Sequence, residues 1–112
     1  MITSASEEDS PIMPKYIIER SMPGAGSLST AQLQAASQHS CAVLHDLGPQ
    51  VQWLETFVTA NKVYCIFIAP DEESIREHAR RGGFAADSIE VITSVVDPST
   101  AESCSALTGA HA

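Results

Sequence analysis

The 112-residue sequence has no apolar run that could cross a membrane as a helix. Its longest such run, residues 63–69, has seven residues, whereas a membrane-spanning helix needs roughly 20. The first residues also lack the basic and apolar regions of a secretory signal. The three cysteines are too widely spaced for a disulfide framework or a CxxC metal knuckle. We therefore expect a cytoplasmic protein with reduced thiols and no membrane partner.

Basic residues are scarce as well. Six Lys and Arg residues stand against fourteen Asp and Glu residues, which gives a formal net charge of −8 at pH 7. No basic stripe is present that could neutralise the phosphates of a nucleic acid, so a nucleic-acid partner is not expected. The charge leaves divalent metal ions and neutral or cationic small molecules as candidate ligands.

The two ends of the chain contain little that could form a core. Residues 1–14 are rich in Ser, Glu and Pro, and residues 98–112 are rich in Ser, Thr and Ala. Such segments do not bury enough apolar surface to offset the entropy that ordering costs. We therefore expect disordered tails on either side of one small domain at residues 15–97.

Six secondary-structure elements are predicted in that domain. β-Branched and aromatic residues predict strands at 15–20, 51–59, 63–69 and 88–96. A capping box of Ser29 and Gln32 starts a helix that runs to Leu47. Asp71 starts a second helix, which ends at a pair of glycines, Gly82-Gly83. The order β-α-β-β-α-β is that of the ferredoxin-like α+β fold, whose four-stranded antiparallel sheet has its first and third strands in the centre.

The two central strands are predicted to be apolar on both faces of the sheet. Tyr16-Ile17-Ile18 and residues 63–68 have no alternation of apolar and charged side chains. Two helices cover only one face of a four-stranded sheet, so the other face needs a second cover. Another copy of the chain is the simplest cover, which predicts a homodimer whose two sheets face each other. The alternative is a monomer with an exposed apolar patch.

Four side chains are candidate metal ligands: His39, Cys41, His45 and His78. Cys41 and His45 are one turn apart on the first helix, a spacing that brings two ligands to one face. The alternative is a small buried cysteine and a solvated histidine near a helix C-terminus. His39 points well away from His45, so these two could share a metal only with help from another chain or element.

His78 could instead line a cavity, because it lies on the sheet-facing stripe of the second helix. Glu19, Tyr64 and Cys65 would be the other polar groups around a bound ligand. The alternatives are a structural His78 bonded to a backbone carbonyl and a solvated Glu19 at the end of its strand. The sequence has no GxGxxG loop, Walker A motif or local Ser-His-Asp set. We therefore name no catalytic residue and expect a binding protein rather than an enzyme.

Four segments of the domain resemble a family of small bacterial domains long described as of unknown function. These segments are Met13-Pro-Lys-Tyr-Ile-Ile-Glu-Arg20, Trp53 with Phe57-Val58, Lys62-Val-Tyr-Cys-Ile-Phe-Ile-Ala-Pro70, and Arg76-Glu-His-Ala-Arg80 with Gly82-Gly83-Phe84. A member of that family is a cytosolic nickel-binding protein with a dimeric, ferredoxin-like α/β-barrel fold. The resemblance covers residues 15–97 and implies the same fold, a homodimer and nickel as the metal. The family's Phe-Pro after the glycine pair is Phe84-Ala85 here.

Residues and resemblance together predict a small cytoplasmic nickel-binding protein that acts as a homodimer. The alternative is a small-molecule-binding protein, or an enzyme, that uses a cavity of the dimeric α/β barrel. Nickel binding that depends on histidine would favour the first reading over the second.

Overall fold

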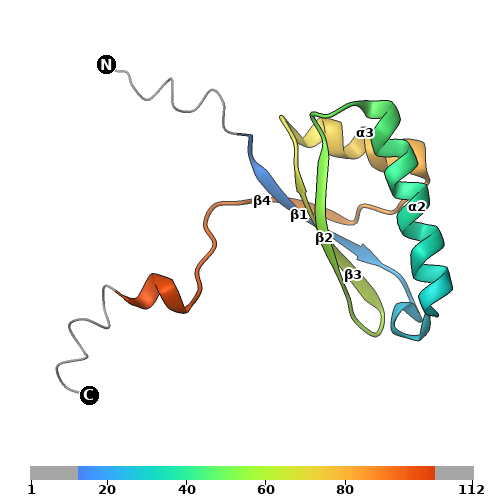
Figure 1. Cartoon of the computed structure of the whole chain (residues 1–112), viewed down its shortest axis with the longest axis horizontal. Helices are drawn as coiled ribbons and strands as arrows, with labels where there is room; N and C mark the ends of the chain where they lie inside the picture. Colours follow the sequence, from blue (N-terminus) through green and yellow to red (C-terminus); the bar gives the residue numbers. More distant parts are fainter. Residues whose placement is uncertain (1–12, 103–112) are drawn as a thin grey trace.

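The computed structural model describes residues 13–102, and its helices and strands follow one another in the predicted order. One sheet contains the strands β1 (Lys15–Ser21), β2 (Gln52–Val58), β3 (Lys62–Ile68) and β4 (Ser88–Ile92). Two helices pack beside it, α2 (Thr30–Leu47) and α3 (Glu72–Gly82) (Figure 1). Short 3-10 helices lie at Ala25–Ser27 (η1) and Pro98–Ala101 (η2).

The sheet is antiparallel, with the strand order β2-β3-β1-β4. β1 and β3 therefore occupy its centre, as predicted. Ile18 of β1 lies opposite Cys65 of β3, and both are buried on the face that the helices cover. A bulge between Trp53 and Glu55 interrupts the pairing of β2 with β3. The ferredoxin-like α+β fold class is confirmed.

Local signals at the helix ends explain where the helices begin and end. The Ser29 hydroxyl accepts a hydrogen bond from the Gln32 backbone N–H (3.1 Å), and the Gln32 side chain accepts one from the Ser29 N–H (2.9 Å). This is the predicted capping box. At the start of α3, an Asp71 carboxylate oxygen accepts a hydrogen bond from the Ser74 N–H (2.8 Å). Gly83 ends α3 with a φ of 72°, in the left-handed region that favours glycine.

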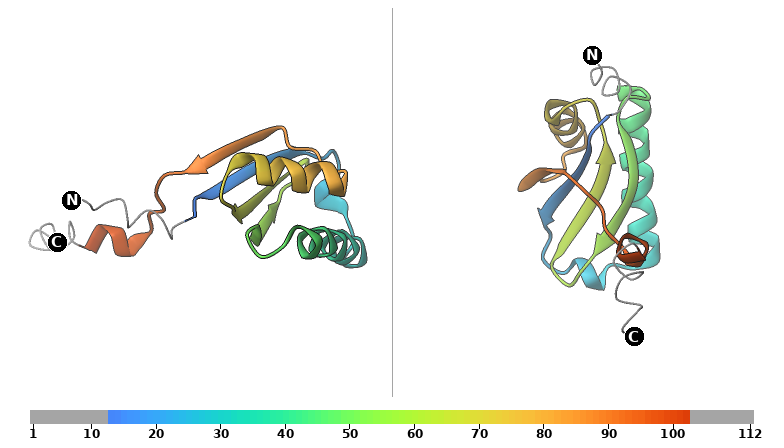
Figure 2. Two further views of the ribbon diagram at one scale, coloured as in Figure 1. Left: turned by 90° about the horizontal axis from the view of Figure 1, so that it is seen from above. Right: turned by 90° about the vertical axis from the view of Figure 1, so that its left-hand side faces the viewer.

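Both helices lie on the same face of the sheet, so the domain has two layers (Figure 2). The core between the layers is apolar, and its most deeply buried large side chains include Ile18, Phe67 and Ile75. No element within residues 13–102 covers the opposite face of the sheet (Figure 2). In the same part of the chain no helix is long and apolar enough to span a membrane.

Helix α2 differs from its prediction in how it packs. Its spacing of apolar residues predicts a stripe from Leu33 to Leu47 against the sheet, yet Leu33 is 36% exposed and Ala36 is also exposed. Val43 is the buried residue of this helix, and Leu44 packs against the core. The C-terminal half of α2 therefore holds the helix in place, while its N-terminal half stands away from the sheet.

Strand β4 is shorter than its predicted span of 88–96. Its last residue, Ile92, lies opposite Lys15, which is the first residue of β1. Beyond that point β4 has no partner strand with which to form hydrogen bonds. Val95 and Val96 are accordingly exposed, at 68% and 72%.

The predicted tails fall largely outside the described residues. Within them, residues 98–101 form the exposed 3-10 helix η2, which follows a cap at Asp97. None of its residues is buried, so η2 adds nothing to the core. The limits of the folded domain at residues 15 and 97 stay a prediction.

Candidate functional site

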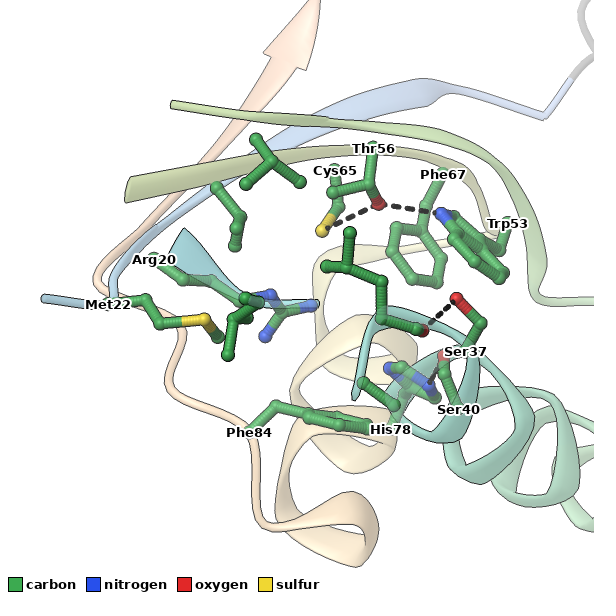
Figure 3. Close-up of a pocket in the computed structure, with 15 residues that line it drawn as sticks. Arg20, Met22, Ser37, Ser40, Trp53, Thr56, Cys65, Phe67, His78 and Phe84 are labelled. Atoms are coloured by element: carbon green, nitrogen blue, oxygen red, sulfur yellow. Dashed lines mark hydrogen bonds between the residues drawn. The ribbon is translucent and has the colours of Figure 1, made fainter. Parts of the chain in front are cut away.

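A cavity of about 320 Å³ lies between the sheet and the two helices, a volume within the usual range for small-molecule sites. It lies beneath the half of α2 that stands away from the sheet (Figure 3). Most of its lining is apolar, with Leu28, Leu33, Val58, Val63 and Phe67 among the contributors. No Asp or Glu is among the described residues that line it.

His78, on α3, lines this cavity and is 1% exposed. Its Nε2 lies 3.2 Å from the Ser40 hydroxyl of α2, and its Nδ1 is buried without a hydrogen-bond partner among residues 13–102. The imidazole packs against two aromatic rings, Phe67 and Phe84, each with its centroid 5.1 Å away. The ring is therefore fixed in position while one of its nitrogens is left unbonded.

Burial controls the charge of this histidine. Together with the smaller effect of the nearby Arg20 charge, burial lowers the pKa of His78 from 6.5 to about 4. The Ser40 backbone, by hydrogen bonding, raises the pKa of His78 and so opposes this shift only in part. The imidazole is therefore neutral at pH 7.

Arg20 brings a positive charge into the same cavity. Its side chain extends from β1 beneath the helices, and the residue is only 5% exposed (Figure 3). The guanidinium carbon lies 5.4 Å from the centroid of Phe84, and Nη1 donates a hydrogen bond to the Ala85 carbonyl. None of the ion pairs found in the described part of the chain includes Arg20. A buried cation thus faces the cavity without a carboxylate partner from residues 13–102.

A chain of hydrogen bonds joins three residues of the opposite wall. The Trp53 indole N–H donates to the Thr56 hydroxyl (2.9 Å), and that hydroxyl donates to the Cys65 sulfur (3.2 Å) (Figure 3). Cys65 is 7% exposed. The Thr56 hydroxyl already accepts one hydrogen bond and donates another within the chain. This wall therefore offers a ligand mainly apolar contacts rather than hydrogen bonds.

The four residues expected to surround one ligand are divided between the two faces of the sheet. Cys65 and His78 line the cavity. Glu19 and Tyr64 lie opposite each other in the register of β1 and β3, on the face that the helices do not cover. They do not line this cavity, because alternate side chains of a strand point to opposite faces. Glu19 instead pairs with Lys62 (2.7 Å), in agreement with the solvated alternative.

The four candidate metal ligands are not gathered into one site. Cys41 and His45 are exposed on α2, whereas His78 is buried. His39 is exposed, its Nε2 lies 2.8 Å from the Gly82 carbonyl oxygen, and its ring meets the edge of Phe84. Successive residues of a helix are rotated by about 100°, so positions 39 and 41 point in different directions. Within residues 13–102, no three side chains of His, Cys, Asp or Glu form a metal-binding group.

Sequence reasoning missed Arg20, Trp53 and Phe84 as residues of the cavity. A signal for Arg20 was available, because strand alternation puts it on the same face as Ile18, which is fully buried. Trp53 and Phe84 carry no comparable signal, since aromatic side chains are as common in a filled core as around a cavity.

The fold and the cavity define a class of small ferredoxin-like α+β domains with an internal ligand-sized space. Within this class the chain can be assigned to one family. Over residues 16–92 it matches the family described as "Nickel responsive protein SCO4226-like", and it belongs to that family. The family resemblance found in the sequence is thereby confirmed, and the protein is a small member of a nickel-related family.

A solved structure supports the fold independently. The chain is similar to SCO4226 from Streptomyces coelicolor A3(2), known from a crystal structure, with a TM-score of 0.63 and 22% sequence identity. The match covers 73% of this chain and 99% of that one. A comparison with curated proteins found no match.

Proposed function

We propose that this protein binds a divalent metal ion, nickel, and that it acts as a homodimer. The observation that carries the proposal is its membership, over residues 16–92, in a family described as nickel responsive. Two properties of the chain support it. The net charge of −8 raises the local concentration of cations, and imidazole is a ligand that suits nickel.

Cys41 and His45 are the best candidates for first contact with the metal. They lie one turn apart on α2, and both are exposed. A thiolate and an imidazole at this spacing can reach one ion from the same helix face. His39 and His78 are less available, because Nε2 of each already has a partner, in Gly82 and Ser40 respectively. Two protein donors leave the remaining coordination positions to water or to another chain.

Calorimetry with nickel and zinc on untagged protein tests this proposal. The double variant Cys41→Ser/His45→Ala should lose most of the nickel affinity. His39→Ala is a matched control on the same helix and should retain it. Nickel binding that survives the double variant unchanged would show that the ligands lie elsewhere. If nickel binding is unchanged when His39, His45 and His78 are all replaced by Ala, nickel does not bind through these histidines.

The homodimer is supported by the uncovered face of the sheet. Strand register puts Ile17, Phe57 and Ile66 on this face. Phe57 is 52% exposed and Ile17 is half-buried, whereas Ile66 is only 9% exposed within the single chain. Large apolar side chains that stay exposed on an uncovered sheet face commonly mark an interface. A second copy that presents the same face would cover the patch on both chains at once.

A further inference from the structure

We propose that the cavity between the sheet and the helices binds a small amphipathic monocarboxylate, with its carboxylate on Arg20 and His78 and its apolar part toward the mouth. This site uses neither Cys41 nor His45, so it is independent of the proposed nickel site.

Arg20 is the first reason for an anionic ligand. A buried charge is normally paired, because removal from water is costly unless an opposite charge or several hydrogen bonds compensate. The guanidinium has five N–H donors, and within residues 13–102 its hydrogen bond is to the Ala85 carbonyl. The guanidinium group at the end of the Arg20 side chain points into the cavity (Figure 3). A carboxylate would fit it well, since the two groups can form paired hydrogen bonds.

His78 is the second, independent reason. Buried polar atoms are nearly always hydrogen-bonded, so the unpartnered Nδ1 of a residue that is 1% exposed points to a partner supplied by a ligand. A bound carboxylate selects the tautomer that has the proton on Nδ1, and in that tautomer the Ser40 hydroxyl donates to Nε2. Nδ1 is then a donor, as is the guanidinium of Arg20. Both side chains pack against the ring of Phe84, so the two donors lie beside the same aromatic side chain.

The rest of the cavity requires an apolar ligand body. Met22, Leu33 and Val58 line it and are 38%, 36% and 40% exposed, so they form its mouth. No acidic side chain among the described residues lines the space and could repel an anion. The sequence as a whole favours cationic or neutral ligands, but the charge inside the cavity is positive.

The volume limits the size of the ligand. With about 30 Å³ for each non-hydrogen atom, as in liquid water, 320 Å³ accommodates about ten such atoms. Octanoate, a straight-chain monocarboxylate, has about this size and is a suitable probe. 1-Octanol and octylamine have the same tail with a neutral and a cationic head.

Trp53 provides a direct readout, because it is the only tryptophan of the chain and lines the cavity. Titration of the full-length protein with each probe, followed by tryptophan fluorescence, should give an affinity for octanoate at least about tenfold higher than for octanol. Octylamine should bind more weakly than octanol. Equal affinities for octanoate and octanol, or no response to either, would overturn the proposal.

Two pairs of variants locate the site. Arg20→Met should weaken octanoate binding by about tenfold or more and leave octanol binding nearly unchanged. Arg76→Met removes the same charge from an exposed position of α3 and should change neither. If Arg20→Met does not fold, Ala36→Phe narrows the mouth from an exposed position and should weaken both ligands. Ala35→Phe, which is exposed and does not line the cavity, is its control. Octanoate binding that is unaffected by both Arg20→Met and Ala36→Phe would refute the site.

Discussion

Replacing His78 with leucine should remove most of the pH dependence of stability between pH 7.5 and 5. Folding keeps the ring neutral and lowers the pKa of His78 to about 4, against 6.5 for an ordinary histidine. The unfolded chain therefore takes up a proton at a higher pH than the folded chain does. The contribution of His78 to the free energy of unfolding is complete above pH 6.5 and is lost as the pH falls toward 4.

The expected loss follows from the two pKa values. One pKa unit is worth about 1.4 kcal/mol, so the complete effect is about 3 kcal/mol, of which about 2 kcal/mol is lost by pH 5. His78 is 1% exposed, so screening by solvent does not greatly reduce the effect. The neighbouring side chains that lower the pKa of His78 further are Arg20 and His39. The carboxyl groups of Asp71 and Glu77 have lowered pKa values, so they titrate below this pH window.

Urea unfolding at pH 7.5, 6 and 5, followed by circular dichroism at one fixed protein concentration, measures the effect. The wild type should lose about 2 kcal/mol across this range, and His78→Leu should lose much less. His45→Gln replaces an exposed histidine of α2 and should behave like the wild type. If His78→Leu loses as much stability as the wild type, the buried imidazole is not the cause and the reasoning fails.

Three further predictions concern assembly, the terminal segments and one glycine. Sedimentation at micromolar concentration should give a dimer, and Ile17→Glu, at a half-buried position of the central strand β1 on the uncovered face, should convert it to a monomer; a monomeric wild type would contradict the dimer proposal. Deletion of residues 1–13 and 98–112 should leave the melting temperature nearly unchanged, so a large drop in calorimetry would mean that one segment packs on the domain. Gly82→Ala should reduce the fluorescence response to octanoate, because a Cβ there would overlap the ring of Phe84 and displace it. A normal octanoate response from this variant would show that the ring position does not matter.

Much of the fold could be predicted because its signals are local or follow from chain order. The Ser29–Gln32 capping box and the Asp71 cap each depend on residues three positions apart. The central positions of β1 and β3 follow from the order of elements. The end of β4 could not be predicted, because Ile92 is its last residue only through its pairing with Lys15, far away in the sequence.

The candidate site was less predictable than the fold. Sequence reasoning identifies Cys65 and His78, and it predicts that His78 lies on the sheet-facing side of its helix. It cannot tell that the N-terminal half of α2 stands over a cavity, because Leu33 and Ala36 have the same spacing as residues of a packed helix face. The distance between a helix and a sheet depends on the side chains of both layers. The spacing of apolar residues along one helix does not determine that distance.

His78 is both a predicted metal ligand and a predicted cavity residue. The charges around it favour a contact with an anionic ligand in the cavity over coordination of a metal ion. The positive charge of Arg20 already disfavours a proton on this imidazole. A nickel ion carries twice the charge of a proton, so the same guanidinium opposes it more strongly at that position. An anion would be attracted by Arg20 and would raise the pKa of His78 when it binds. Saturation with nickel should therefore leave the fluorescence of Trp53 unchanged, whereas octanoate should alter it. A fluorescence response to nickel that His78→Leu abolishes would reverse this assignment.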